Sequence, residues 1–313
     1  MVNKRVPRIA VATASAGNYV PFARVLASSL HEQHPDLPLF FGISDELQGR
    51  LEPGREEFEV VTIPELPLPE PRRFLFRHRR RAAAIAVKPY LLEHVLDLGF
   101  EAVLYIDVDV LVLRDLSELL TATGRSSITL LPHLVEPLGG ADRAARELNI
   151  LQSGVFNGGV LGVRESEEAR RFLAWWQARV YLHCRHAVAD GLHFDQRWLD
   201  LVPSYFEDVQ VFRDPDVDVA HWNLPERDLS SCRLFHFSGF DPDRPGELTS
   251  YSNRLALEAV DAAPELFRRY RDELLAAGWP EARDLPYGYG RFDNGVVIPA
   301  IAREIYSDLG EAA

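Results

Sequence analysis

The segment from Ala102 to Leu113 restricts the fold most, because an apolar run there leads into two aspartates and a second apolar run follows. Length and residue types predict a buried strand over residues 102–106. Carboxylates are almost never buried without a partner, so two of them at the end of such a strand require a cation. Residues i and i+2 of an extended backbone point the same way, so Asp107 and Asp109 can aim at one point while Val108 turns back into the core.

Carboxylate oxygens are ligands that suit Mg²⁺ or Mn²⁺, and these ions keep open positions for water and for the phosphates of a substrate. The segment therefore predicts a metal-bound diphosphate at the carboxyl edge of a sheet. The alternative is a helix-capping aspartate with an exposed neighbour, and a D-x-D motif alone does not decide between the two.

Composition narrows the function classes. The 313 residues, 47% of them hydrophobic, are enough for one large α/β domain or two small ones. A formal net charge of −13 argues against a nucleic-acid partner and makes a metal more necessary at any phosphate site. The two cysteines, Cys184 and Cys232, are far apart, which excludes a cysteine-rich zinc site and fits a reducing compartment.

Targeting signals are not apparent. No window approaches the ~18–20 apolar residues of a membrane span, and the basic, polar residues 1–8 precede only a short apolar segment, which predicts no signal peptide. We therefore expect a cytoplasmic protein. The run of arginines between Arg72 and Arg81 would still permit peripheral contact with the inner face of a membrane.

The first half of the chain predicts a nucleotide-binding sheet. Strands expected at residues 9–12, 39–43 and 58–63 surround a helix that Pro21 opens, and this order favours a parallel sheet with a nucleotide at its carboxyl edge. Neither a G-x-G-x-x-G motif nor a Walker A motif is present, so dinucleotide and P-loop sites are not supported. The loop after the first strand either holds a base or ribose or is an ordinary turn.

Between that region and the aspartates lies a basic segment. Residues 64–71 are rich in proline, and we expect them to be extended and exposed. The arginines of residues 72–81 follow, with no acidic residue among them. An anion-binding site is favoured, and a solvated surface is the alternative. Lys88 then precedes a helix expected over residues 89–98, near a helix N-terminus that itself favours anions.

The second half holds further polar groups at the ends of apolar runs. Asn157 lies in a glycine-rich segment before a strand, and a helix with a buried stripe follows at Phe172, Leu173, Trp176 and Val180. The histidines at 183, 186 and 193 match no compact metal site, so a solvated loop is favoured. Taken alone, His236 is better explained as a core histidine. The C-terminal residues predict a long helix from Leu255 through Phe267, Tyr270 and Leu274, ending near Gly278.

These motifs together resemble glycosyltransferase family 8, which includes glycogenin and bacterial lipopolysaccharide galactosyl- and glucosyltransferases. The resemblance covers roughly residues 6–239. It rests on Asn18 and Tyr19 before the first helix, on Lys88 before the helix expected over residues 89–98, and on the segments YIDVDVLV, FNGGVLGV, FDQRWL and HFSG. It implies an α/β GT-A fold with a mostly parallel central sheet flanked by helices and a helical C-terminal addition. The expected division is a GT-A domain over 1–249, with a nucleotide-binding half (about 6–131) and an acceptor-side half (about 132–249), and an extension over 250–313.

The resemblance also implies roles for single residues. Asp107, Asp109 and His236 look like the ligands of Mn²⁺ or Mg²⁺. The residues expected to contact the donor or the reaction centre are Ala12, Thr13, Asn18, Tyr19, Lys88, Val108, Asn157, Asp195, Gln196 and Gly239. The family's lysine after the H-x-x-G segment is absent, and Arg244, in a proline-bounded loop, is the hypothesised leaving-group cation. The arginines of residues 72–81 are the competing source.

The function implied is a metal-dependent glycosyltransferase that moves a hexose from a nucleotide sugar, usually a UDP-sugar, with retention. The acceptor expected by analogy is a glycan, a lipid-linked oligosaccharide or a protein. A sugar-nucleotidyltransferase is the runner-up, weakened because the N-terminal region lacks a glycine-rich, basic loop for a triphosphate. A non-catalytic nucleotide-sugar-binding protein is a third alternative, and the complete set of metal ligands argues against it.

Overall fold

The computed structural model describes residues 8–47, 51 and 54–308. Residues 1–7, for which the sequence predicts no signal peptide, lie outside the described residues. The strands are β1 (Ile9–Ser15), β2 (Leu39–Ile43), β3 (Glu59–Thr62), β4 (Ala102–Ile106), β5 (Val110–Val112), β6 (Ile128–Pro132), β7 (Phe156–Arg164), β8 (His186–Ala187), β9 (Leu192–His193), β10 (Val209–Val211) and β11 (Leu234–His236). The α-helices are α1 (Val20–Gln33), α2 (Pro71–Arg77), α3 (Arg80–Ala86), α4 (Lys88–Asp97), α5 (Ser117–Thr123), α6 (Arg143–Ser153), α7 (Glu167–His183), α8 (Val202–Tyr205), α9 (Ala263–Ala276), α10 (Trp279–Ala282) and α11 (Ala300–Asp308).

A seven-stranded sheet forms the centre of the fold, in the order β10-β6-β7-β4-β1-β2-β3. β1 pairs in parallel with β2 and β4, and β2–β3 and β6–β10 are also parallel. β7 is antiparallel to both of its neighbours. The predicted α/β architecture with a mostly parallel sheet is therefore confirmed.

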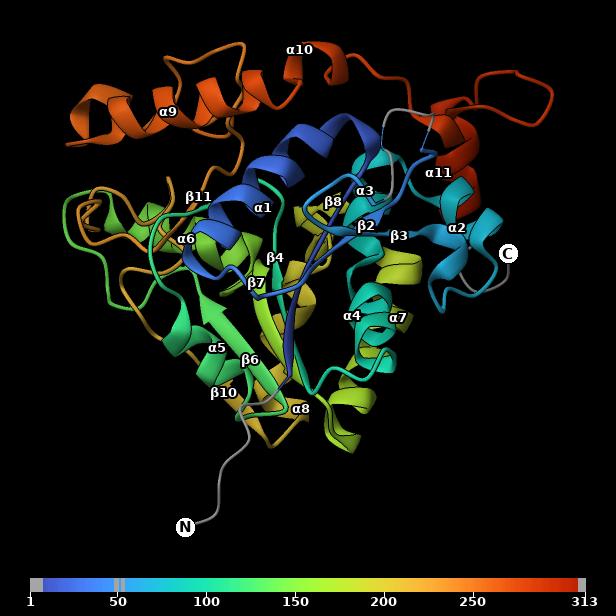
Figure 1. The fold of residues 1–313 in the computed structure, drawn as a ribbon, viewed down its shortest axis with the longest axis horizontal. Coiled ribbons are helices and arrows are strands. Elements are labelled where there is room, and N and C mark those ends of the chain that lie inside the picture. Colours follow the sequence, from blue (N-terminus) through green and yellow to red (C-terminus); the bar gives the residue numbers. More distant parts are fainter. Residues whose placement is uncertain (1–7, 48–50, 52–53, 309–313) are drawn as a thin grey trace.

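Helices cover both faces of this sheet (Figure 1). Alternate residues of a strand point to opposite faces, so Leu104 and Ile106 pack with α1 and α9, whereas Val103 and Tyr105 pack with α4 and α7. Such burial on both sides explains why β4 is a continuous apolar run. The stripe predicted on α7, from Phe172 to Val180, is buried as expected.

A small second sheet connects distant parts of the chain. β5 pairs with β11 antiparallel, and Val110 lies opposite His236. The backbone N–H of Phe237 also donates to the carbonyl of Asp109 at 2.8 Å. This pairing brings His236, which is far along the chain, to the two aspartates that follow β4.

Two expectations, for the proline-rich segment and for the C-terminal helix, are wrong in part, although Pro64, Pro67 and Pro69 are exposed as predicted. The proline-rich segment contains a short 3-10 helix, Ile63–Glu65, and Leu66 and Leu68 are buried, because these leucines face the core while the prolines need no hydrogen bond. The long C-terminal helix begins at Ala263 rather than near Leu255. Pro264 is tolerated in the first turn of a helix but not in its interior, so the helix starts there.

The C-terminal part returns to the N-terminal half. α9 packs on α1, and α11 lies beside α2 (Figure 1). No helix among the described residues is long and apolar enough to cross a membrane. The division at about residues 131 and 249 stays a prediction, and strands from both expected halves form the one central sheet.

Candidate functional site

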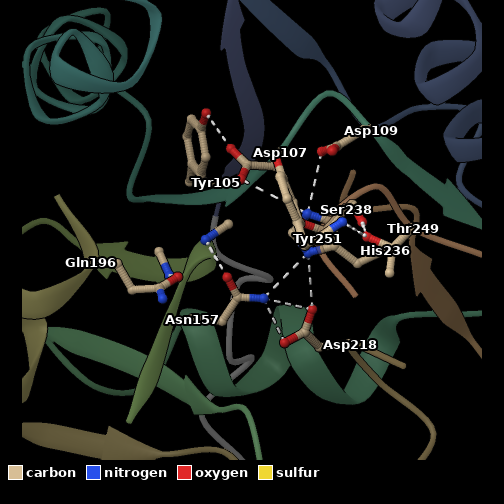
Figure 2. A network of polar contacts seen from close by, with 12 residues as sticks. Tyr105, Asp107, Asp109, Asn157, Gln196, Asp218, His236, Ser238, Thr249 and Tyr251 are labelled. Carbon is tan, nitrogen blue, oxygen red and sulfur yellow. Dashed lines mark hydrogen bonds and ion pairs between the residues drawn. The ribbon is translucent and has the colours of Figure 1, made fainter. Parts of the chain in front are cut away.

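Asp107, Asp109 and His236 converge at the carboxyl end of β4 (Figure 2). One ligand atom from each lies within 4.8 Å of the others. His236 Nε2 is 3.2 Å from Asp109 Oδ1 and 4.0 Å from Asp107 Oδ2. Neighbouring ligands of an octahedral Mg²⁺ lie about 3 Å apart, so small shifts would let the three groups bind one ion.

The backbone of β7 packs directly against this cluster at Gly159. A Cβ atom on Gly159 would lie 2.6 Å from both Asp107 Oδ2 and His236 Cε1, so a larger residue there would displace both side chains. The carbonyl of Gly159 also accepts a hydrogen bond from the backbone N–H of Asp107, which fixes the turn after β4. The donor set of two carboxylates and an imidazole fits Mn²⁺ or Mg²⁺.

Opposite charges draw His236 and the aspartates together. Burial alone would lower the pKa of His236, but Asp109 and then Asp218 outweigh it and raise that pKa to about 10. Burial would likewise raise the pKa of Asp109, but the charge and hydrogen bond of His236, with a smaller contribution from Arg81, hold it below its usual value. A bound cation would take over the role of the imidazolium proton.

Lys88 lies at the first position of α4 and is almost fully buried. Its Nζ donates to the carbonyl of Gly158 at 2.9 Å and lies 3.1 Å from Asp107 Oδ1 and 3.2 Å from Asp195 Oδ2. The ammonium therefore combines one hydrogen bond to the backbone with two ion pairs. The resemblance implies that Lys88 approaches the donor phosphates and nearby aspartates, and the structure places it beside the carboxylates of Asp107 and Asp195.

Asp195 and Gln196 lie at the start of a 3-10 helix, Gln196–Leu201, beside β7. Burial raises the pKa of Asp195 to about 6, against the opposing effect of Lys88, and the charge of Asp107 adds to the rise. Gln196 is held at both ends of its amide: Oε1 accepts from Gly158 N at 3.0 Å and Nε2 donates to Ser153 O at 2.9 Å.

Asn157 is part of β7 itself and points toward the metal-ligand cluster (Figure 2). Its Nδ2 donates to both carboxylate oxygens of Asp218, at 2.7 and 2.6 Å, and its Oδ1 accepts from Gly159 N at 2.7 Å. Asn157 therefore links the turn below the metal ligands to a second buried carboxylate.

The loop expected to hold a base lies after β1. Ala12 and Thr13 are fully buried strand residues, and Asn18 is buried in the 3-10 helix Gly17–Tyr19. The hydroxyl of Thr13 and Oδ1 of Asn18 have no hydrogen-bond partner among the described residues. The ring of Tyr19 stacks on Phe22, and burial, with the charge of Asp109 next, raises the pKa of Tyr19 to about 12.

A cavity of about 530 Å³ adjoins this loop rather than the aspartates. It lies between the start of α1, the end of β2 and α10, with Gly17, Val20 and Asp45 in its wall. Asp45 accepts a hydrogen bond from Gly288 N at 2.7 Å, so the C-terminal segment closes one side of this region.

Most of the arginines of residues 72–81 contact the segment over residues 285–307. Arg79 pairs with Glu304 at 2.8 Å, and Arg80 donates to the carbonyl of Leu285 at 2.6 Å. Arg81 differs, because its Nη2 donates to the hydroxyl of Tyr251 at 2.8 Å and its charge acts on Asp109.

Gly239 and Arg244 lie in the segment after β11. Gly239 has φ +76°, and a Cβ there would meet Thr249 and the ring of Tyr251 at 2.6 and 2.7 Å, so only glycine fits without displacement. Arg244 is 65% exposed and lies 3.8 Å from both Asp241 and Glu247. The structure thus packs Gly239 against Thr249 and Tyr251 and leaves Arg244 on an exposed loop.

The sequence did not predict two residues that contact site residues, Asp218 and Tyr251. Asp218 was not singled out, although an acidic residue in the apolar run Val217–Ala220 is a signal of the same kind as the D-x-D motif. Tyr251 follows a loop whose two ends are joined by a hydrogen bond from Ser250 N to Gly239 O at 2.8 Å. No local sequence pattern predicts this contact.

Comparisons with known proteins show a shared fold. No protein-family model matches the chain. The uncharacterized Bacillus subtilis (strain 168) protein YfnF is 25% identical over 237 residues, which are 70% of this chain and 77% of YfnF. The glycosyltransferase GlyE of Streptococcus pneumoniae TIGR4 matches with a TM-score of 0.51 at 14% identity, over 92% of this chain and 67% of GlyE. The galactosyltransferase LgtC, solved with donor and acceptor sugar analogues, matches with a TM-score of 0.48 at 17% identity, over 84% of this chain and 95% of LgtC.

Proposed function

We propose that this protein is a metal-dependent glycosyltransferase that moves a hexose from a nucleotide sugar to an acceptor. The observation that carries the proposal is the convergence of Asp107, Asp109 and His236 at the carboxyl edge of the sheet, beside the buried pair of Lys88 and Asp195. The fold shared with the glycosyltransferase GlyE supports it. Ligands of α/β sheets bind at this edge.

Asp107, Asp109 and His236 would hold Mn²⁺, or Mg²⁺ in its place. The ion would stabilise the negative charge that develops on the diphosphate as the sugar–phosphate bond breaks. A fixed cation is needed because the net charge of −13 repels an anionic donor. Arg81 lies near Asp109 and can contribute to the same charge balance; Arg244 could do so only if its loop closed and its ion pairs opened.

The sugar would lie against β7 and the 3-10 helix that follows Asp195. Asn157, Asp195 and Gln196 line this side, and each is held by contacts to the backbone or to a buried partner. Fixed side chains of this kind orient a substrate without a reorganisation cost. We propose that the reaction retains the anomeric configuration.

The base would occupy the loop after β1. Buried polar atoms are normally hydrogen-bonded, so the unpartnered atoms of Thr13 and Asn18 favour a ligand with donors and acceptors, such as uracil. The partly exposed ring of Tyr19 offers a stacking surface beside them. We propose a UDP-sugar as the donor.

The acceptor is proposed by analogy as a glycan, a lipid-linked sugar or a protein. Arg72, with 93% of its side chain exposed, could approach an anionic membrane surface at the cytoplasmic face. Its Asp293 partner lies 3.7 Å away and is equally exposed, so this pair is weak.

A panel of nucleotide sugars tests the proposal. Thermal unfolding with and without Mn²⁺ identifies the donor, because a ligand that binds the folded state raises Tm. We expect one UDP-sugar to raise Tm with Mn²⁺ and to release UDP slowly, while EDTA abolishes both effects. Turnover of sugar 1-phosphate and nucleoside triphosphate would instead indicate a nucleotidyltransferase. Binding without product from any donor and acceptor mixture would indicate a non-catalytic binder.

A further inference from the structure

We propose that Asp218 is a positioning residue that holds His236 with Nε2 directed at the metal. Asp218 Oδ1 lies 3.3 Å from His236 Nδ1, on the side of the ring opposite to Asp109 (Figure 2). A histidine that binds a metal through Nε2 carries its proton on Nδ1, and a carboxylate there fixes both the tautomer and the ring orientation. This inference rests on the proposed metal site but not on the identity of the sugar.

The backbone around Asp218 is built to hold this carboxylate in place. Its φ of +61° is uncommon for a residue other than glycine and is strained unless its surroundings impose it. Val219 N donates to Leu234 O at 3.1 Å and His236 N donates to Val219 O at 2.8 Å, so Asp218 and His236 are anchored through the same bridge. The side-chain amide of Asn223 donates to the carbonyl of Asp218 at 2.9 Å and secures the turn that follows.

The remaining contacts leave Asp218 directed at the imidazole. Asn157 Nδ2 donates to both carboxylate oxygens, so part of their acceptor capacity is already used. Asn157 Nδ2 also lies 3.3 Å from His236 Nδ1, but two donors do not form a hydrogen bond, so a proton on Nδ1 goes to Asp218. The ring of Trp222 packs edge-on against His236 at 5.2 Å and limits rotation of the imidazole.

Asp218 therefore connects two parts of the site that are far apart in sequence. The same carboxylate holds Nδ2 of Asn157 on β7 and Nδ1 of His236 on β11. Both partners lie around Gly159, where an added Cβ would meet the oxygen of Asn157 and the ring of His236. Asp218 is 2% exposed, and its carboxylate is directed at Asn157 and His236 rather than at solvent.

Mn²⁺ binding to the full chain, with UDP but without sugar or acceptor, tests this role. Free Mn²⁺ is measured by electron paramagnetic resonance for the wild type, Asp109→Asn, Asp218→Asn and Asp216→Asn. We expect Asp218→Asn to weaken binding 10- to 100-fold, as is usual for the partner of a metal-bound histidine. Asp216→Asn is the matched control, because Asp216 lies on the same segment and accepts a hydrogen bond from Ser231 rather than from His236.

The results separate the metal site from the role of Asp218. Binding that is lost in Asp109→Asn supports the site; binding that is unchanged in Asp218→Asn overturns the positioning role while leaving the site intact. A wild type that binds no Mn²⁺ overturns both. An equal loss in Asp216→Asn and Asp218→Asn also overturns the specific role, since it indicates a general effect of the segment.

Nitrogen NMR of the wild type provides a measurement that does not depend on how Asp218→Asn folds. In ¹⁵N-histidine-labelled wild type with Mg²⁺ and UDP, the signals of His236 are those missing from His236→Gln. We expect Nδ1 of the wild type to be protonated and Nε2 to carry the metal shift. An unprotonated Nδ1 in the metal-bound wild type overturns the proposal, even if Asp218→Asn does not fold.

Discussion

The ammonium of Lys88 and the carboxylate of Asp195 form a buried ion pair, with 3.2 Å between Nζ and Oδ2 and 4% of each side chain exposed. Burying two charges costs free energy, so such a pair contributes little net stability while its loss is costly. The pair therefore serves the site more than the fold. It holds a carboxylate beside β7, where burial raises the pKa of Asp195 to about 6 against the lowering effect of Lys88.

Removing the lysine should destabilise the protein in a pH-dependent way. Lys88→Met leaves Asp195 as a buried charge without its partner, and we expect the free energy of unfolding to fall by about 3–5 kcal/mol at pH 8. The folded-state pKa of Asp195 would rise further above its unfolded value, so the loss should shrink as the pH falls and this carboxyl becomes protonated. Urea unfolding at pH 8 and pH 5 measures it. Equal losses at both values would contradict the explanation, and Lys88→Met with Asp195→Asn should be less destabilised than Lys88→Met alone at pH 8.

Removing a metal ligand should abolish transfer without unfolding the chain. Asp109→Asn is expected to lower kcat by on the order of 100-fold or more, because charge stabilisation on the leaving diphosphate is lost. The side chain of Asp109 is 22% exposed, so the fold should tolerate the amide. Asp115→Asn is the control, since that exposed aspartate contacts Ser117 and not the site. Full activity of Asp109→Asn at saturating donor would refute the assignment.

The stereochemistry of the product can be observed directly. We expect retention, with Asn157, Asp195 and Gln196 lining the reacting face; this expectation rests on the FDQRWL segment and the family resemblance that it supports. NMR of the first-formed product, before mutarotation or further transfer, distinguishes the anomers. An inverted anomeric centre would rule out this part of the proposal.

Arg81 and Arg244 are the two candidates for the cation that stabilises the leaving diphosphate. Arg81→Ala should lower kcat by roughly 10- to 100-fold with a smaller change in donor KM, because the contact strengthens as charge develops. Arg244→Ala should show this effect only if the loop over residues 240–249 closes on the donor. Arg79→Ala is a matched control, as its guanidinium pairs with Glu304. A larger loss in Arg244→Ala than in Arg81→Ala would assign the role to Arg244.

Acid should destabilise the protein partly through His78. Burial lowers the pKa of His78 to about 3, against the rise from its bond to the carbonyl of Tyr181. In the unfolded state His78 binds a proton with a pKa near 6.5. The contribution of neutral, buried His78 to the free energy of unfolding is therefore fully present above that pH and is lost as the pH falls toward 3. At pH 5 the loss relative to pH 7.5 is about 2 kcal/mol from this residue.

His78→Gln keeps a donor for Tyr181 but has no titration in this range. Its unfolding free energy should therefore depend less on pH between 7.5 and 5 than that of the wild type. Denaturant unfolding at both pH values measures the difference. His31→Gln is the control, since that histidine is partly exposed and bonds Leu37 O. Parallel pH dependence in His78→Gln and wild type would contradict the prediction.

Local pattern determined much of this protein. Strand β4 and the direction of Asp107 and Asp109 follow from an apolar run and the two-residue repeat of extended backbone. The stripe on α7 and the start of α4 follow from helical periodicity and proline placement. These features depend on neighbours within a few residues, so the sequence alone predicts them.

Tertiary structure decided the rest, because the deciding contacts join residues far apart in the chain. His236 reaches the aspartates only through the pairing of β11 with β5, and a single apolar run ending in histidine cannot reveal that pairing. Asp218 acquires its role from Asn157 and His236, which lie 61 and 18 residues away. The arginine run reads as one cluster in sequence, yet Arg79 and Arg80 bind the C-terminal segment while Arg81 faces Tyr251, because helix geometry sends successive side chains in different directions.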